Sequence, residues 1–110
     1  MPGKFSDLVQ GTLDMLILKT LALEPMHGYG ISVRIEQMSK GTFKINAGSL
    51  FVALQRLERA GVIKSEWKAT ENNRRAKYHS LTEQGRKKLG NETREWERQV
   101  AAITRILEAS

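Results

Sequence analysis

The side chains best suited to chemistry lie in one stretch of this chain, residues 48–81. Leu50, Leu54 and Leu57 are spaced four and three apart, which predicts a helix over residues 48–60 with one buried face. The side chains expected to face outward are Ser49, Val52, Gln55, Arg56 and Arg59, with Phe51 at the margin. In the major groove of DNA, Gln can pair with adenine and Arg with guanine. The alternative interpretation is an ordinary solvated helix face.

A short hairpin rich in cations is expected to follow this helix. Gly61 ends the helix, and two β-compatible runs, residues 62–69 and 75–81, are joined by the polar tip of residues 70–74. Its side chains suited to phosphate or minor-groove contact are Asn73, Arg74, Arg75 and Lys77. A tip rich in Lys and Arg is otherwise a soluble turn, so the charge distribution has to distinguish the two interpretations.

The positive charge of the chain is concentrated on this hairpin and just after it. Of the formal net charge of +6, residues 64–88 supply most, with eight Lys and Arg against three Asp and Glu. Residues 1–63 carry +2 and residues 89–110 carry −1. A merely solubilising surface usually mixes both signs, so this concentration favours a binding surface for a polyanion such as nucleic acid.

Composition excludes several other classes of protein. The 110 residues allow one domain, and the absence of cysteine excludes disulfides and thiolate chemistry. The two histidines, His27 and His79, have no clustered carboxylates beside them, so structural or surface roles are expected rather than metal binding. No nucleophile–base pair or phosphate loop is present, so we expect neither an enzyme nor a cofactor. No secretory signal or membrane span is recognisable, which favours the cytoplasm.

Two further helices are expected ahead of this stretch. The first runs over residues 7–23, with Ser6 as its N-cap, and ends before Pro25. Its apolar residues occupy more than one side, which suits a central helix or one shared with a partner subunit. The second begins near residues 27–30 and continues through Met38.

Smaller elements complete the expected arrangement. Residues 42–45 are a short extended piece that could pair with the hairpin as a third strand, and Asn46 or Ser49 caps the helix that follows. Tyr29 either donates its hydroxyl to a phosphate or lies in the core, and both alternatives are open. Trp67, on the first strand of the hairpin, is expected to pack against the hairpin.

The last helix carries an apolar stripe that is expected to pack against another helix. Thr82 can cap it, and its apolar and small positions are then spaced 4, 3, 4, 3 and 4 apart, at Leu89, Thr93, Trp96, Val100, Ile103 and Leu107. Because the upstream elements already close a core, the expected partner is the same helix of a second subunit. The sequence therefore predicts a homodimer.

Four motifs in order resemble the PadR family of bacterial transcriptional regulators. They are residues 11–18 (GTLDMLIL), 27–31 (HGYGI), 48–61 (GSLFVALQRLERAG) and 72–78 (NNRRAKY), the last followed by residues 81–85 (LTEQG). The chain departs from the family at Phe51, where tyrosine is usual, and at His79, where a second aromatic residue is common.

This resemblance implies a mainly α (α+β) fold, a winged helix-turn-helix with a C-terminal dimerisation helix. Residues 1–81 would form the DNA-binding domain and residues 82–110 the dimerisation helix, as one compact unit. The implied activity is transcription regulation, usually repression relieved by a small molecule. A twofold dimer would read a pseudo-palindromic operator with half-sites about one helical turn apart.

The sequence leaves two alternatives open. Trp96 either packs in the dimer core or lines, with its copy in the second subunit and with Met15 and Val100 nearby, a cavity for a flat apolar effector. The whole chain could instead be a winged-helix module that binds protein and not DNA. The basic residues Arg74, Arg75 and Lys77 count against that alternative.

Overall fold

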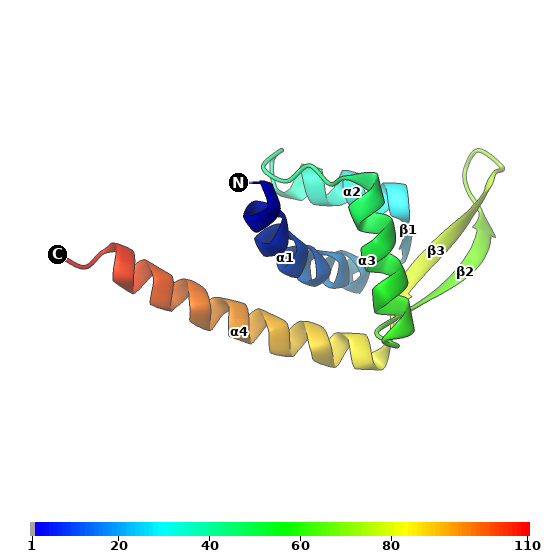
Figure 1. The fold of residues 1–110 in the computed structure, drawn as a ribbon. Helices are drawn as coiled ribbons and strands as arrows, with labels where there is room; N and C mark the ends of the chain where they lie inside the picture. The colour runs from blue at the N-terminus through cyan, green and yellow to red at the C-terminus, as the bar shows by residue number, and fades with distance from the viewer. Residues whose placement is uncertain (1) are drawn as a thin grey trace.

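Four helices and a three-stranded antiparallel sheet form a winged helix-turn-helix, as predicted. The computed structural model describes residues 2–110, with side chains from residue 11 onward. In chain order the elements are α1 (Pro2–Leu23), β1 (Met26–His27), α2 (Gly28–Met38), α3 (Ala47–Arg59), β2 (Ile63–Ala69), β3 (Arg75–Leu81) and α4 (Glu83–Leu107). Helices α1, α2 and α3 pack together, the β2–β3 hairpin extends beside α3, and α4 runs along α1 and away from the hairpin (Figure 1).

Helix α1 begins earlier than predicted. It starts at Pro2, so the prediction of a start at Asp7 with Ser6 as N-cap is wrong. Proline lacks a backbone N–H, which costs nothing in the first turn of a helix, and its fixed φ favours that position. The predicted end before Pro25 is confirmed, because α1 stops at Leu23.

The core lies between α1, α2, α3 and the sheet. Its largest fully buried apolar side chains come from all of these elements and are Ile17, Leu18, Ile31, Leu57 and Ile63. Burial of both Ile17 and Leu18 confirms that α1 is covered on more than one side. The helix is therefore central to the fold.

The third strand is not the one that the sequence suggested. Strand β1 (Met26–His27) pairs with β3, giving the order β1-β3-β2, so the prediction of a strand over residues 42–45 is wrong. Phe43 and Ile45 are half-buried and pack against the core instead. Burial of these apolar side chains holds the segment between α2 and α3 without any sheet pairing.

Side chains cap the N-termini of α2, α3 and α4. The Nδ1 atom of His27 accepts a hydrogen bond from the N–H of Gly30 at 3.0 Å, which gives this histidine the structural role expected of it. Asn46, rather than Ser49, caps α3 by accepting from the N–H of Ser49 at 3.0 Å. Thr82 caps α4 as predicted.

Two glycines connect α3, the hairpin and α4. Gly61 has φ 77°, in the left-handed region that glycine tolerates, and it ends α3 as predicted. Gly85 is buried, and a Cβ atom on it would lie 2.0 Å from the carbonyl oxygen of Val62. Glycine at this position lets the start of α4 pack directly against the backbone that follows α3.

No helix among residues 2–110 combines the length and the apolar character needed to cross a membrane.

Candidate DNA-binding surface

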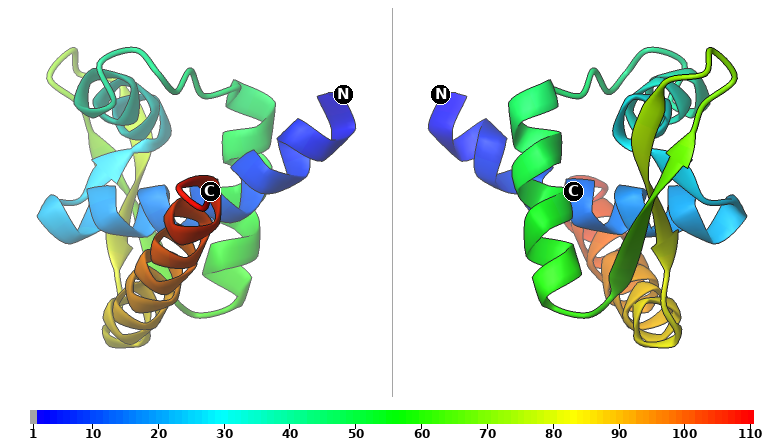
Figure 2. Two further views of the ribbon diagram at one scale, coloured as in Figure 1. Left: turned by 90° about the vertical axis from the view of Figure 1, so that its left-hand side faces the viewer. Right: turned by 90° about the vertical axis from the view of Figure 1, so that its right-hand side faces the viewer.

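Helix α3 and the hairpin lie side by side on one face of the molecule. We call residues 62–81, which comprise β2, β3 and their connection, the wing. In the right-hand view of Figure 2 both α3 and the wing face the viewer, while α4 lies behind them. The long terminal helix therefore leaves from the other side, and this face is free to meet a large partner.

The exposed face of α3 is the one that the spacing of its leucines predicted. Leu50, Ala53, Leu54 and Leu57 are buried. Since successive residues are about 100° apart around a helix, Val52 and Gln55 point away from this buried side. Ser49 and Gln55 are exposed, and Phe51 and Val52 keep 61% and 52% of their surface accessible.

Arg56 is held against α1 by an acidic partner. Its Nη1 atom lies 2.5 Å from Oδ2 of Asp14, and its Nη2 atom lies 3.1 Å from Oδ1 of the same residue. The hydrogen bonds to Asp14 raise the pKa of Arg56 further above its usual value. The guanidinium group of Arg56 is thus engaged within the protein, although its side chain remains partly exposed.

The wing presents its cations unevenly. Asn73, with φ 63°, and Arg74 lie exposed at the tip, where the N–H of Asn73 donates to the carbonyl of Thr70 at 2.9 Å. Arg75 is exposed on β3. The Nζ atom of Lys77 lies 3.5 Å from Oε1 of Glu58 on α3, so this cation also ties the wing to α3. Asn73, Arg74 and Arg75 are therefore the more available of the four predicted wing contacts.

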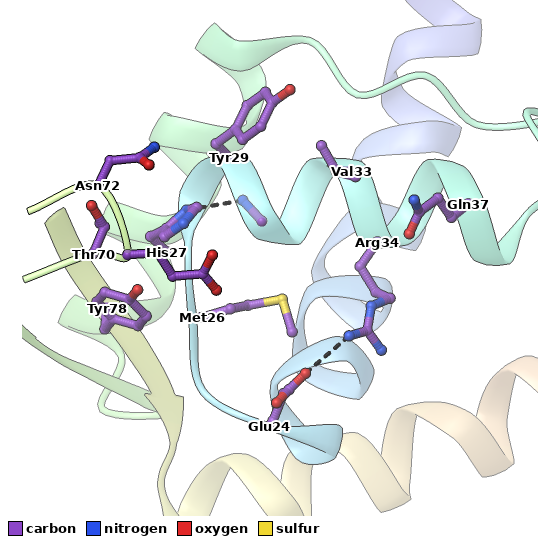
Figure 3. A pocket seen from close by; sticks show the side chains of 12 residues that line it. Glu24, Met26, His27, Tyr29, Val33, Arg34, Gln37, Thr70, Asn72 and Tyr78 are labelled. Atoms are coloured by element: carbon purple, nitrogen blue, oxygen red, sulfur yellow. Dashed lines mark hydrogen bonds and ion pairs between the residues drawn. The ribbon is translucent and has the colours of Figure 1, made fainter. Parts of the chain in front are cut away.

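Tyr29 is a surface residue. Its side chain is 77% exposed at the first turn of α2, which excludes the core alternative. It lies at the edge of a pocket of about 490 Å³ between α2 and the wing tip. Figure 3 shows its hydroxyl pointing away from the other lining side chains. On the opposite side of that pocket Arg34 donates to Glu24 at 2.9 Å. The hydroxyl of Tyr29 is thus available to a partner.

A hollow of about 580 Å³ lies between α3 and the wing, and we call it the helix–wing groove. Its lining includes three exposed aromatic residues, Tyr29, Phe51 and Trp67. Trp67 contacts the wing as predicted, with the guanidinium of Arg75 5.9 Å from its ring centre, but it is also 59% exposed toward this groove. Trp67 was not among the site residues predicted from the sequence. The signal was available, because antiparallel pairing of the two strands places Trp67 opposite Lys77 on the same face.

His79 lies at the base of the same groove. Its side chain is buried, and Nδ1 has no hydrogen-bond partner among the residues that the structure describes. Burial lowers the pKa of His79, because the protonated imidazolium form would lose its hydration. No group of His, Cys, Asp or Glu that could hold a metal ion occurs in the described part of the chain.

The residues predicted for dimerisation and effector binding lie on the far side of the molecule. Met15 and Trp96 line one open hollow of about 350 Å³ between α1 and α4. Val100, one turn further along α4, is not among the described residues that line it. Beyond this hollow the stripe of α4 is exposed at Val100, Ile103 and Leu107, while Leu89 near its start is half-buried against the core.

Comparisons with known proteins agree with this geometry. A family model described as "Transcriptional regulator PadR-like family" matches residues 17–91. An uncharacterised protein X of Lysinibacillus sphaericus is 31% identical over 91 residues, which cover 83% of this chain and 84% of that protein.

Solved structures of regulators are also similar. A transcriptional regulator from Clostridium thermocellum superposes with a TM-score of 0.85 and 31% identity, covering 94% of this chain and 97% of that one. A PadR family transcriptional regulator from Eggerthella lenta has a TM-score of 0.80 and 28% identity, covering 99% of this chain and 93% of that one.

Proposed function

This chain belongs to the PadR-like family of transcriptional regulators, and we propose that it acts as a repressor that binds operator DNA as a homodimer. Regulators of this family bind DNA and are not enzymes. The observation that supports the proposal is the placement of α3 beside a basic wing on one face (Figure 2). A bacterial repressor of this kind would act in the cytoplasm, where the DNA is.

The two elements would have different roles on DNA. Helix α3 enters the major groove and presents Ser49, Phe51, Val52 and Gln55 to base edges. Asn73, Arg74 and Arg75 of the wing contact phosphates or the adjacent minor groove, and Tyr29 donates its hydroxyl to a phosphate. Because the wing neutralises phosphates and releases their counterions, binding should weaken steeply with added salt.

The dimer would form through α4. Trp96, Val100, Ile103 and Leu107 are exposed along one stripe of a helix that extends beyond the rest of the chain. A second copy of the same stripe would bury these side chains by twofold symmetry. In this arrangement residues 1–81 are the DNA-binding part and residues 82–110 the dimerisation helix. The two copies of α3 would then read a pseudo-palindromic operator.

A small planar hydrophobic molecule would act as the effector. The hollow lined by Met15 and Trp96 lies beside the exposed stripe of α4 that the second subunit would cover, with Val100 one turn further along this stripe. A ligand bound there would favour dimers with a different separation of the two α3 helices. DNA release would follow from that shift in population.

A mobility-shift assay on genomic fragments tests this function. The wild-type chain should retard a specific subset of fragments, and Arg74→Ala/Arg75→Ala should weaken the shift by tenfold or more. Arg86→Ala/Lys87→Ala is the matched control, since it removes two exposed cations from α4 rather than from the wing. A protein that binds no duplex even at low salt would contradict the proposal and favour a protein-interaction module. An equal loss of DNA binding in both double variants would show that the cations of the wing have no specific role.

A further inference from the structure

The exposed face of α3 includes large apolar side chains as well as polar ones. Phe51 and Val52 are large hydrophobic side chains, and each leaves more than half of its surface accessible to solvent. They follow one another in the N-terminal half of α3, and the N-terminal residues of a recognition helix are those that usually contact base edges. Exposed apolar side chains at that position would bind favourably to an apolar group on the DNA.

The charged groups of α3 are largely engaged elsewhere. Arg56 forms its two hydrogen bonds with Asp14, on the side of α3 that faces α1. Glu58, on the side that faces the wing, pairs with Lys77. Arg59 is the last residue of α3 and lies seven positions after Val52, about 10 Å along the helix axis. Ser49 and Gln55 are therefore the polar groups nearest to Val52, and Gln55 is the one whose amide can pair with adenine.

We propose that α3 reads the C5 methyl groups of thymine through Phe51 and Val52 and an adenine through Gln55, so that A·T pairs define each half-site. The inference rests on the proposed function and names the class of DNA sequence that the site takes. Thymine alone among the four bases carries a methyl group in the major groove, and an amide side chain pairs with N6 and N7 of adenine.

The spacing of these residues suits neighbouring base pairs. Val52 and Gln55 are three residues apart, which is about 4.5 Å along a helix axis, whereas successive base pairs are about 3.4 Å apart. An A·T pair presents a methyl group from one strand and the adenine edge from the other. Adjacent A·T pairs would thus supply the methyl and the adenine edge within the span of one helix turn.

The same geometry disfavours guanine as the central base. Guanine is recognised by a bidentate Arg or Lys that donates to O6 and N7. Using Arg56 for this purpose would first require breaking both of its hydrogen bonds with Asp14 and leaving that carboxylate without them. A G·C pair opposite Phe51 or Val52 would also offer no methyl group to bury.

The test begins with selection of bound sequences from a random duplex pool by the wild-type protein. Each thymine of the selected half-site is then replaced by deoxyuridine, which removes only the methyl group, and affinity is measured by fluorescence anisotropy. One or two positions per half-site should weaken binding about fourfold each, the effect of losing one buried methyl group. In Val52→Ala the ratio of the affinities for thymine and deoxyuridine at one of these positions should fall to nearly one, because the variant has already lost the contact between Val52 and the methyl group.

Matched variants separate recognition from folding. Val52→Ala places a strong helix former at a half-exposed position, so it should fold even if Phe51→Ala does not. Met38→Ala is the control, since it truncates an equally exposed apolar side chain at the far end of α2 and should keep the full deoxyuridine penalty.

The outcomes distinguish the inference from the function on which it rests. A selected motif centred on G·C pairs, or deoxyuridine without effect at every thymine, would overturn thymine readout while leaving DNA binding intact. An unchanged penalty in both Val52→Ala and Phe51→Ala would also overturn it. Failure to enrich any sequence, together with no binding at low salt, would refute both proposals.

Discussion

Helices α3 and α4 carry the same kind of apolar repeat, but the two repeats differ in how far they are buried. In α3 the repeat of Leu50, Leu54 and Leu57 is buried against α1, α2 and the sheet. In α4 the positions from Trp96 to Leu107 remain exposed. Periodicity thus predicts a helix and its apolar face, but it does not tell whether the surface that covers this face belongs to the same chain.

The largest expected effect comes from placing a charge on the stripe of α4. Ile103→Asp should convert the proposed dimer into a folded monomer, because a carboxylate cannot be buried in an apolar helix–helix contact without a partner. Affinity for a two-half-site operator should fall about 100-fold or more, since the two heads would then bind independently. Analytical ultracentrifugation and anisotropy on the same samples measure both changes.

Two control variants make this comparison sharper. Ala101→Asp introduces the same charge at an exposed position about 130° around α4 from the stripe and should leave the proposed dimer intact. Leu54→Ala, in the buried repeat of α3, should instead destabilise the fold by about 2–5 kcal/mol, measured by chemical denaturation. If Ile103→Asp unfolded the chain and Leu54→Ala did not, the roles assigned to the two helices would be reversed.

A smaller effect is expected from releasing Arg56 on the recognition side. Asp14→Ala removes both acceptors of its guanidinium and should change stability by at most about 1 kcal/mol, because the ion pair is partly exposed. With Arg56 released, the sequences selected from a random duplex pool should contain guanine more often beside the A·T positions. A repeat of the selection experiment measures this, and an identical motif would show that Asp14 does not restrict Arg56.

The smallest expected effect concerns pH and the helix–wing groove. Burial holds the pKa of His79 below the value of about 6.5 that it has in the unfolded chain, so the unfolded state binds more protons on acidification. Stability should therefore decline as the pH falls through about 6.5, until the folded histidine is itself protonated.

Melting temperatures between pH 7.5 and 5.5 should reveal this trend. His79→Phe removes the titrating group while keeping a ring at the base of the groove. The variant should lose this part of the pH dependence, and an unaltered profile would assign the trend to other groups.

Local signals in the sequence predicted most of the elements that position the candidate site. The apolar spacing around Leu54, the end at Gly61 and the cap at Thr82 all depend on nearby residues, and the structure confirms them. The start of α1 at Pro2 was missed because Ser6 is a residue type that often caps a helix, whereas α1 has already begun four residues before it.

Contacts between distant residues were not predictable in the same way. Strand β1 has only two residues, which is too short for an alternating pattern, and its partner β3 lies some fifty positions away. The groove position of Trp67 likewise depends on how the wing packs beside α3. For Arg56, periodicity gave an outward position, but its partner Asp14 lies 42 residues earlier.

The sequence by itself therefore determined the helix faces, the hairpin and the concentration of positive charge on it, because each follows from residues within a few positions of one another. The tertiary structure alone decided which exposed groups remain available to a partner. It holds Arg56 against α1, leaves Phe51 and Val52 accessible, and leaves the stripe of α4 uncovered. The physical reason is that an ion pair or a buried contact depends on distance in space, and only packing brings distant parts of the chain together.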